Sequence, residues 1–350
     1  MIFYFSEKKD YSINAGGKAP ADIDWICSQL GYIPIYFPHR EAHEESVLKK
    51  MDMLACVLKS WFKTFLKVKK NDIIIYQYPM CAMPIANKLI PILNRRKIKI
   101  ISIVHDLSSL RYREADISKK QLRYYIQCDN SLKHSYKIIA HNSKMKQYLI
   151  SQGISDKTIE CLGLFDYLCN DNQKDSVCDF KSIAIAGNLN PRKSGYVYKL
   201  AAMKKAIRIY LYGPNYNNSF ESQNIIYKGS FEADELPEHM IAGFGLVWDG
   251  PDLDTCSGSL GQYLKFNNPH KFSMYLASNK PIIIWKKAAL ADFVFQNNIG
   301  IVIESLEDIG DCLNAISSEE YVIMRKNASE LGELVRRGHY TREALSKCIN

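Results

Sequence analysis

GLVWDGPDLDTCSGSLGQYLKFNNPHKFSMYLASNKPIIIW, residues 245–285, indicates the fold class most clearly. It places an apolar strand, a polar glycine-rich loop, a helix and a second apolar strand in succession. Strands that are apolar along nearly their whole length are typical of parallel sheets covered by helices on both faces. In such sheets ligands bind beyond the carboxyl ends of the strands. The stretch therefore predicts both a parallel sheet and the edge at which a ligand binds.

The same alternation extends outward in both directions. Apolar strands are predicted at 32–37, 72–78, 97–106, 137–142, 182–189, 208–215, 225–231, 243–250, 280–285 and 300–305. Amphipathic helices are predicted at 19–30, 46–68, 81–94, 119–129, 268–278, 288–297 and 318–335. The polar, unpatterned residues 168–181 indicate an interdomain linker. We predict an α/β chain of two doubly wound, Rossmann-like domains, 1–170 and 182–335, with a C-terminal helix over 336–350 that packs back on the first domain.

The composition of the chain excludes several classes of protein. The chain has 350 residues, of which 47% are hydrophobic and 24% charged, so disordered and coiled-coil classes are excluded. No apolar run reaches the ~18 residues of a membrane span, and the N-terminus does not resemble a signal peptide, so we expect a cytoplasmic protein. The ten cysteines form no C-x-x-C pair, which favours reduced thiols over zinc sites or disulfides. The net charge of +9 favours an anionic ligand, whether nucleic acid, lipid or phosphate.

The helix within the opening stretch carries the strongest anion signal. Asn268 is a suitable N-cap and Pro269 suits the first helical position, which puts His270 and Lys271 in the first turn. A lysine there opposes the helix dipole unless an anion occupies the helix N-terminus. Lys271 and the backbone N–H groups would then hold a diphosphate. The structural alternative is a lysine whose side chain simply extends into water.

Two further segments follow strands of the second domain. SIAIAGNLNPRKSG (182–195) ends its strand at Gly187 and Asn188, and the cations Arg192 and Lys193 follow where an anion could dock. The alternative is an ordinary turn with a solvated helix start. Neither G-x-G-x-x-G nor a Walker A pattern is present. The D-x-D of Asp252 and Asp254 is weak evidence for a metal, because loop carboxylates also bind sugar hydroxyls or water.

The first domain offers candidates for acid–base chemistry. His105 and Asp106 end the strand at 97–106, at the edge where such sheets place catalytic side chains, and either could act as a general base on a sugar hydroxyl. His141 and Asn142 end the next strand. The paired glycines of Asn14–Ala19 allow a loop to pass close to a ligand, although a surface turn would use them equally well.

The helix predicted over 46–68 is amphipathic and basic. Its apolar residues recur at helical spacing and alternate with lysines, which continue to Lys70. Such a helix can lie on an anionic membrane surface. The alternative is that the apolar face packs on the sheet and the lysines face water.

Several of these segments together resemble the bacterial β-galactofuranosyltransferases of O-antigen assembly and, more distantly, the glucosyltransferases that extend N-acetylglucosamine on serine-rich adhesins. The resemblance spans nearly the whole chain. It is carried by the opening stretch with its continuation to residue 293, by Asn14–Ala19, by IVHD (103–106), by HN (141–142), by FDYL (165–168) and by AGNL (186–189).

The resemblance implies a GT-B fold and an inverting hexosyl transfer from a UDP-sugar that uses neither a metal nor a cofactor. The first domain would bind the acceptor and the second the donor, with His105 or Asp106 as the catalytic base. The expected donor-binding residues are Gly16, Lys18, Gly187, Asn188, Arg192, Tyr212, Trp248, Asp249, Thr255, Asn268, His270 and Lys271. Within this set, Lys271 and Arg192 would hold the diphosphate, and Trp248, Asp249 and Thr255 would shape the sugar or nucleotide pocket.

The expected partners are a UDP-sugar and a glycan or lipid-linked oligosaccharide. The sequence leaves open an anionic membrane surface, with the protein peripheral on the inner face of the cell membrane, and a homo-oligomer. The leading prediction is a galactofuranosyltransferase. The alternatives are a glucosyltransferase acting on glycoprotein N-acetylglucosamine and a non-catalytic nucleotide-sugar or polyanion-binding module. A UDP-sugar epimerase is disfavoured because the nicotinamide fingerprint is absent, and nucleic acid because aromatic residues do not interleave with basic ones.

Overall fold

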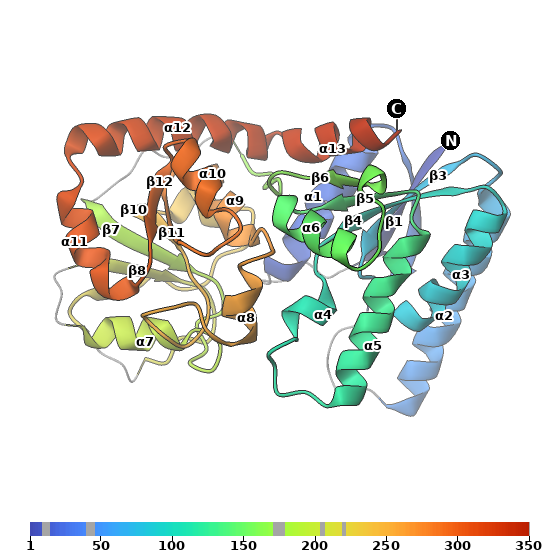
Figure 1. Ribbon diagram of the computed structural model, residues 1–350, viewed down its shortest axis with the longest axis horizontal. Coiled ribbons are helices and arrows are strands. Elements are labelled where there is room, and N and C mark those ends of the chain that lie inside the picture. The colour runs from blue at the N-terminus through green and yellow to red at the C-terminus, as the bar shows by residue number, and fades with distance from the viewer. Residues whose placement is uncertain (9–14, 40–45, 171–178, 204–206, 219–221, 350) are drawn as a thin grey trace.

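The computed structural model describes residues 1–8, 15–39, 46–170, 179–203, 207–218 and 222–349. These residues form two six-stranded sheets, and every pairing between their strands is parallel. The predicted pair of doubly wound α/β units is therefore confirmed. Figure 1 shows the two units side by side, and we call them the N-terminal lobe (residues 1–168) and the C-terminal lobe (residues 179–336).

The strands follow the chain in two groups of six. The first sheet consists of β1 (Ile2–Lys8), β2 (Ile33–Pro38), β3 (Ile73–Tyr78), β4 (Lys99–Val104), β5 (Lys137–Ala140) and β6 (Ile159–Cys161). The second consists of β7 (Asp179–Ala186), β8 (Ile209–Tyr212), β9 (Ile225–Tyr227), β10 (Ala242–Val247), β11 (Ile282–Trp285) and β12 (Gly300–Ile303).

Helices connect the strands. Those of the N-terminal lobe are α1 (Ala15–Gln29), α2 (Val47–Lys67), α3 (Met83–Arg95), α4 (Ser108–Arg111), α5 (Lys119–Asp129) and α6 (Ser143–Ser151). Those of the C-terminal lobe and the C-terminal segment are α7 (Gly195–Ala202), α8 (Gly258–Tyr263), α9 (His270–Ala277), α10 (Ala291–Gln296), α11 (Ile309–Ala315), α12 (Ser318–Arg336) and α13 (His339–Ile349). Short 3₁₀ helices lie at Asn130–His134, Asp156–Thr158, Leu236–His239 and Leu306–Asp308.

The first sheet is buried on both faces. Phe3 and Phe5 of β1 join an apolar cluster on one face, whereas Tyr4 between them joins the cluster on the other. Successive residues of a strand point to opposite faces, so a strand covered on both sides must be apolar throughout. This explains why the strands were recognisable as continuous apolar runs.

The strand orders place a reversal point in each sheet. The first sheet has the order β2-β1-β3-β4-β5-β6, so the connections change direction between β1 and β3. The second has the order β12-β11-β10-β7-β8-β9, with its reversal between β7 and β10. A crevice opens beyond the carboxyl ends of the strands at such points, and ligands bind there. The segments after β1 and β3, and after β7 and β10, are therefore the expected positions of a site.

The last two helices join the lobes. Figure 1 shows α12 lying along the C-terminal lobe and α13 continuing over the N-terminal lobe. Ala344, Leu345 and Cys348 of α13 are buried in the same cluster as Tyr4 and Ile101 of the first sheet. The C-terminal segment thus ties the two lobes together through apolar contacts.

Some boundaries differ from those predicted. Helix α1 begins at Ala15 rather than residue 19, so Gly16 and Gly17 lie in its first turn and not in a loop, while Asn14 lies outside the described residues. Strand β7 begins at Asp179, inside the predicted linker 168–181, of which residues 171–178 lie outside the described part. Within the described residues, no helix has the length and hydropathy needed to cross a membrane.

Candidate active site

Two cavities lie at the reversal points of the sheets. The N-terminal cavity has a volume of 310 Å³ and is lined by Phe5, Glu7, Gly16, Ala19, Pro20, Gln77, Pro79, Met80, His105, Asp106, Phe165, Asn267, Asn268, Pro269 and His270. The C-terminal cavity has a volume of 280 Å³ and is lined by Gly16, Tyr167, Ala186, Gly187, Asn188, Lys193, Tyr212, Gly213, Pro214, Ser230, Phe231, Ala233, Leu236, His270, Lys271 and Met274. Gly16 and His270 line both cavities, so the two spaces meet there.

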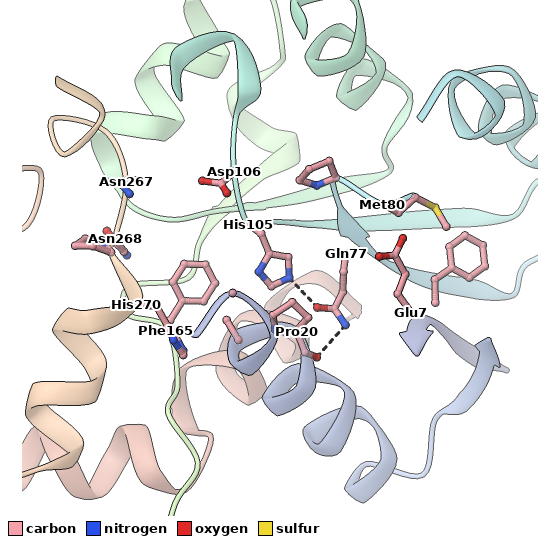
Figure 2. Close-up of a pocket in the computed structure, with 15 residues that line it drawn as sticks. Glu7, Pro20, Gln77, Met80, His105, Asp106, Phe165, Asn267, Asn268 and His270 are labelled. Atoms are coloured by element: carbon pink, nitrogen blue, oxygen red, sulfur yellow. Dashed lines mark hydrogen bonds between the residues drawn. The ribbon is translucent and has the colours of Figure 1, made fainter. Parts of the chain in front are cut away.

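His105 is held in the N-terminal cavity by a chain of hydrogen bonds. Its Nε2 lies 2.7 Å from Oε1 of Gln77, and Nε2 of Gln77 donates to Asp24 at 2.6 Å (Figure 2 shows the Gln77 contact). Because the amide nitrogen of Gln77 donates, its oxygen accepts, and Nε2 of His105 carries the proton. Nδ1 is then the basic nitrogen of the neutral ring. The ring also stacks on Phe165, with centroids 5.7 Å apart.

Asp106 has a different environment from its neighbour. Its Oδ2 pairs with the guanidinium of Arg111 in α4, and Tyr263 of the C-terminal lobe also donates to it. Burial raises the pKa of the Asp106 carboxyl, whereas Arg111 and Tyr263 act in the opposite direction. The carboxylate therefore holds Arg111 and Tyr263 in place at the junction of the lobes, while His105 presents a nitrogen that can accept a proton.

The wall of the C-terminal cavity is built from the ends of β7 and β8. Gly187 follows β7 with a φ of 135°, and Gly213 follows β8 with a φ of 131°. A Cβ on Gly213 would collide with the carbonyl oxygen of Gly187, so the backbones approach each other only because glycine is present. Phe231, Leu236 and Met274 add apolar surface. Such a cavity suits a flat, partly apolar group.

Lys271 marks the polar end of this cavity. Its Nζ donates to the backbone oxygen of Trp248 and to Oδ1 of Asp249, both at 2.9 Å. An ammonium group has three N–H donors, so these contacts leave one for a ligand. Lys193 lines the same cavity, and its pKa is lowered by desolvation and by the nearby charges of Lys271 and Arg111, against the effect of Asp249. Two cations of the C-terminal lobe, Lys193 and Lys271, thus line the same cavity.

His270 separates the two cavities as a neutral side chain. Its Nε2 lies 3.2 Å from the backbone oxygen of Asp166, and its ring contacts Tyr167 at 4.9 Å between centroids. Desolvation lowers its pKa to about 4. The ring is therefore uncharged near neutral pH and acts as a wall and hydrogen-bond donor rather than as a cation for phosphate.

The N-cap assigned to Asn268 is wrong. Helix α9 begins at His270, its N-cap is Pro269, and no side chain caps it. Asn268 is buried and bonds across the lobes instead. Its Nδ2 donates to the backbone oxygens of His141 and Gly163, its Oδ1 accepts from Asn142, and its backbone N–H donates to Nδ1 of His141. The segments 141–142 and 267–269 therefore form one hydrogen-bonded joint between the lobes. This joint fixes the start of α9.

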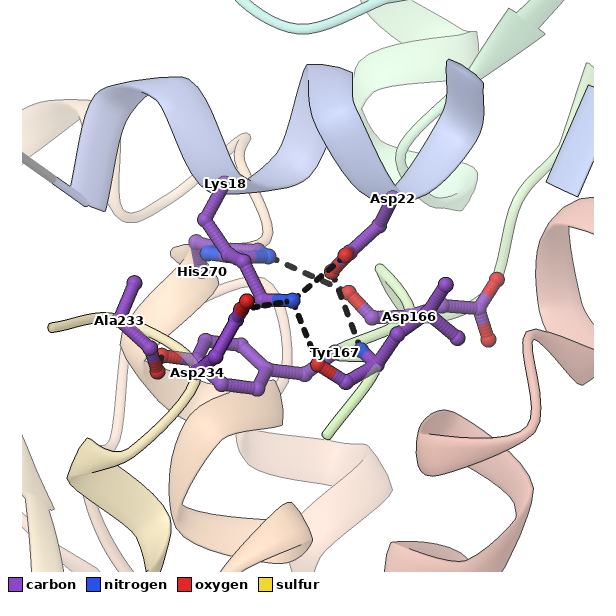
Figure 3. Close-up of polar contacts among 8 residues, drawn as sticks. Lys18, Asp22, Asp166, Tyr167, Ala233, Asp234 and His270 are labelled. Atoms are coloured by element: carbon purple, nitrogen blue, oxygen red, sulfur yellow. Dashed lines mark hydrogen bonds and ion pairs between the residues drawn. The ribbon is translucent and has the colours of Figure 1, made fainter. Parts of the chain in front are cut away.

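Lys18 also lies between the lobes. Its ammonium group is buried and pairs with Asp22 of the same helix and with Asp234 of the C-terminal lobe, both at 2.6 Å (Figure 3). It donates in addition to the backbone oxygen of Leu168. Lys18 was expected to approach the donor, but the structure places it in this ion-pair cluster and outside both cavities.

Other predicted residues lie outside the cavities as well. Trp248 is fully buried, and its Nε1 donates to the backbone of Asp252, so its side chain shapes the sheet edge and not a pocket wall. Arg192 is exposed, Thr255 lies in the loop before α8, and neither lines a cavity. Asp252 pairs with Lys199 and accepts from Ser257. Among the described residues, no group of three or more His, Cys, Asp or Glu side chains is placed to hold a metal ion.

Two residues of this site, Gln77 and Asp24, were not predicted from the sequence. Gln77 and Asp24 orient His105, yet Asp24 lies 53 residues before Gln77 on another element, so no local spacing indicates the contact. Arg192 and Lys193 were both candidates for binding an anion, and the course of the turn brings Lys193, but not Arg192, to the cavity. A signal for Gln77 was present in its position, one residue before the end of β3 at a reversal point.

The chain matches family models along most of its length. The model described as "Glucosyltransferase 3-like, N-terminal domain" matches residues 4–162, and the corresponding C-terminal domain model matches residues 183–348. The β-1,6-galactofuranosyltransferase WbbI of Escherichia coli K12 is 33% identical over 287 residues, which cover 81% of each chain. Glucosyltransferase 3 of Streptococcus gordonii is 22% identical over 337 residues, 95% of this chain and 93% of that protein.

Solved structures share the arrangement of the lobes. WaaG, a glycosyltransferase involved in lipopolysaccharide biosynthesis, superimposes with a TM-score of 0.61 at 8% identity and covers 99% of both chains. The apo form of the lipopolysaccharide outer core galactosyltransferase WaaB has a TM-score of 0.59 at 14% identity, over 100% of this chain and 99% of that one. At these identities the likeness bears on the fold alone.

Proposed function

Because this chain belongs to the glucosyltransferase 3-like family, we propose that it transfers a hexosyl group, specifically galactofuranosyl, from a UDP-sugar to a hydroxyl group of a glycan or lipid-linked oligosaccharide. That the chain is a glycosyltransferase of the GT-B fold follows from the family models, the relatives and the neighbouring structures. The donor sugar, the acceptor and the mechanism are the content of the proposal. The relative named as a galactofuranosyltransferase supports the choice of donor.

One observation carries the proposal: the two cavities meet at Gly16 and His270. The C-terminal cavity offers apolar walls for a uracil and ribose and cations for a diphosphate. The N-terminal cavity holds a histidine base. Sugar transfer needs the acceptor hydroxyl, the base and the leaving group within one water-excluding space. Two cavities that adjoin at Gly16 and His270 support such an arrangement.

The proposed reaction is a single displacement with inversion. Nδ1 of His105 accepts the proton of the acceptor hydroxyl while the acceptor oxygen forms a bond to the anomeric carbon. The bond from that carbon to the diphosphate oxygen breaks on the opposite face, and UDP leaves with the electron pair. Lys271, Lys193 and the N-terminal N–H groups of α9 stabilise the charge that develops on the diphosphate. This mechanism assigns no step to a metal ion.

Asp106 is assigned a positioning role in this scheme. Its carboxylate pairs with Arg111 and accepts from Tyr263, and both contacts oppose the effect of burial, which raises its pKa. A carboxylate committed to a guanidinium is a weaker acceptor for a substrate proton than the neutral imidazole beside it. The positive charge of Arg111 contributes to the lowered pKa of Lys193.

A panel of donors and acceptors tests the function. The purified chain is incubated with UDP-galactofuranose, UDP-glucose or UDP-N-acetylglucosamine, together with a glucoside or an N-acetylglucosamine-bearing peptide, and UDP release and product mass are measured. We expect turnover with UDP-galactofuranose and the glucoside. Turnover only with UDP-glucose and the peptide would replace the proposal with the glucosyltransferase activity named for the streptococcal relatives. Tight UDP binding without any turnover would indicate a binding module.

A further inference from the structure

Helix α2 has an apolar stripe that the sheet does not cover. Val57, Trp61 and Thr64 face the core and are buried. Six large apolar side chains, spaced three or four residues apart along the helix, instead face outward: Leu48, Met51, Leu54, Leu58, Phe62 and Leu66. Leu48 is 78% exposed, Phe62 65% and Leu66 68%. The expectation that the apolar face of this helix packs on the sheet is therefore wrong for most of these residues.

Cations border this stripe on both sides. Lys59, Lys63 and Lys67 follow one another at four-residue spacing next to it, and all three are exposed. On the other side lies the end of α3, where Nη1 of Arg96 donates to the backbone oxygen of Phe65 at 2.9 Å. Lys88 and Arg95 are exposed on α3 as well. Asp52 is the only acidic residue in the sequence of α2.

The position of the stripe relates it to the active site. Helix α2 runs back from the carboxyl end of β2 to the amino end of β3, so its N-terminal half lies toward the carboxyl edge of the first sheet. His105 projects from that same edge. Figure 1 shows α2 and α3 together on the side of the N-terminal lobe that is turned away from the C-terminal lobe. The stripe can therefore contact an extended surface while the cleft stays open.

We propose that the outward stripe of α2, together with the cations of α2 and α3, is a docking surface for an anionic lipid bilayer. The apolar side chains enter the boundary between headgroups and acyl chains, and the lysines and arginines pair with lipid phosphates. This inference goes beyond the transfer reaction and does not depend on the identity of the donor or the acceptor.

Charge complementarity selects lipid over a second copy of the chain. A two-fold interface would place α2 against α2, because such an interface uses the same patch on both subunits. The two sets of lysines would then face each other with a single acidic residue on each helix to offset them. An anionic bilayer instead offers negative charge along the whole border of the stripe. Exposed apolar patches bordered by polar residues commonly mark protein or membrane contacts, and here the excess of positive charge decides between them.

Vesicle co-sedimentation of the full chain tests the proposal. The vesicles contain phosphatidylethanolamine and phosphatidylglycerol, with phosphatidylcholine vesicles as the uncharged comparison. We expect the protein to bind the anionic vesicles, less so at high salt, and to bind phosphatidylcholine at least roughly tenfold more weakly. The double variants L58S/F62S and K59E/K63E should each lower binding to anionic vesicles by roughly tenfold or more.

Matched controls change the same residue types elsewhere. F295S/V322S removes two apolar side chains of the C-terminal lobe that are 79% and 62% exposed, and K228E/K326E reverses two exposed lysines there. Both controls should bind vesicles as the wild type does, and circular dichroism spectra with thermal unfolding midpoints report that all variants fold. Failure of the wild type to bind anionic vesicles, or equal loss in the controls, would overturn the proposal. It would also be overturned if L58S/F62S changed only the oligomeric mass in sedimentation velocity, which would identify the stripe as a contact between copies. No arm uses sugar transfer, so the proposed function can fail independently.

Discussion

His105 owes its orientation to residues from separate elements. Asp24 of α1 anchors Gln77 of β3, and Gln77 fixes the imidazole that follows β4. A base held in one tautomer needs no reorganisation before it accepts a proton. In the proposed mechanism, the hydrogen-bond chain orients His105 as a buried carboxylate orients other histidine bases, with an amide inserted between the two groups.

Removing this base should slow transfer without weakening donor binding. We expect His105→Ala to lower kcat by about 10²–10⁴-fold, while the Kd for UDP stays unchanged because His105 lies outside the C-terminal cavity. Gln77→Leu should give a smaller loss and shift the acidic limb of the kcat–pH profile, because the tautomer is no longer fixed. Steady-state kinetics and calorimetric UDP titrations measure both. Full activity of His105→Ala would transfer the role of base to Asp106.

The cations of the C-terminal cavity should dominate UDP affinity. Lys271→Ala and Lys193→Ala should each raise the Kd for UDP by about 10-fold to 100-fold, since each removes a charge-assisted hydrogen bond to a phosphate. In Lys271→Ala the Asp249 carboxylate also loses its cation. The variant Asp249→Asn removes that carboxylate charge, so it separates the effect of losing Lys271 from the effect of leaving Asp249 unpaired. Lys199→Ala is the matched control, because Lys199 is a surface lysine of the same lobe that pairs with Asp252 away from the cavities. Equal Kd values for Lys193→Ala and Lys199→Ala would remove Lys193 from the site.

At the scale of single residues, the sequence could indicate residue types but not final positions. Among the predicted residues that line the C-terminal cavity are Gly187, Asn188, His270 and Lys271. They could be predicted because the ends of apolar strands and the start of a helix can be recognised in the sequence. Trp248 and Lys18 could not be placed in this way. Trp248 donates to the backbone of Asp252 and Lys18 pairs with Asp234, and both partners belong to loops whose course is set by tertiary contacts.

At the scale of elements, the packing of α9 on β10 decides where Lys271 lies. Gly245 of β10 faces Tyr275 of α9 so closely that a Cβ would collide with the tyrosine ring. The hydroxyl of Tyr275 donates to the backbone oxygen of Ala184 at 3.2 Å and accepts from the N–H of Ala186 at 2.9 Å, so the ring cannot move away cheaply. Because Gly245 has no side chain, α9 can pack this close to β10.

Gly245→Ala should both destabilise the protein and disturb the donor site. Overpacking of this kind costs about 1–3 kcal/mol, and displacement of α9 carries Lys271 with it, so the Kd for UDP should rise. Chemical denaturation and UDP titration measure the two effects. Gly16→Ala is the comparison for stability alone, because its Cβ meets nothing within 4 Å, whereas its place in the wall of both cavities excludes it as a control for the UDP titration. A Gly245→Ala variant as stable as the Gly16→Ala variant would show that β10 and α9 are not tightly packed.

The elements were more predictable than their ends. Strands covered on both faces and helices between them follow from apolar patterning, and the two sheets confirm this. The start of α9 did not follow the capping rule, because Asn268 makes better use of its amide across the lobes than at the helix end. Local capping preferences contribute little free energy, and buried hydrogen bonds between distant residues override them.

At the scale of the whole molecule, the joint between the lobes depends on a neutral histidine. His141 is buried, its Nε2 donates to the backbone oxygen of Val104 at 2.9 Å, and its Nδ1 accepts from the backbone N–H of Asn268 at 2.9 Å. Burial lowers the pKa of His141 from 6.5 to about 4. Protonation would place a donor against the N–H of Asn268, so the charged form is incompatible with the joint.

Stability should therefore fall on acidification. A histidine whose pKa is lowered in the folded state contributes stability above its unfolded pKa, and this contribution is lost as the pH falls from about 6.5 through about 4. For His141 the loss is about 3 kcal/mol. His141→Gln should be less stable at neutral pH but should have a shallower pH dependence of the free energy of unfolding, the remaining slope including a share from His270. His134→Gln, at an exposed position, should leave the dependence unchanged. An unaltered slope in His141→Gln would contradict this account of the joint.

The arrangement of the two lobes relative to each other could not be predicted from sequence patterns. Lys18 reaches Asp234 across more than half of the chain, and α13 buries Leu345 against the first sheet. Both contacts orient the two reversal points toward each other. In the proposed site, this orientation brings His105 at one sheet edge toward Lys193 and Lys271 at the other.

A crystal structure of the chain with UDP tests that site most directly. We expect uracil and ribose in the cavity bounded by Gly187 and Tyr212. The diphosphate should lie within hydrogen-bond distance of Lys193 and of Lys271 at the start of α9, with its terminal phosphate directed toward His105. UDP bound elsewhere on the chain, with Lys271 still paired only to Asp249 and Trp248, would contradict the proposed site.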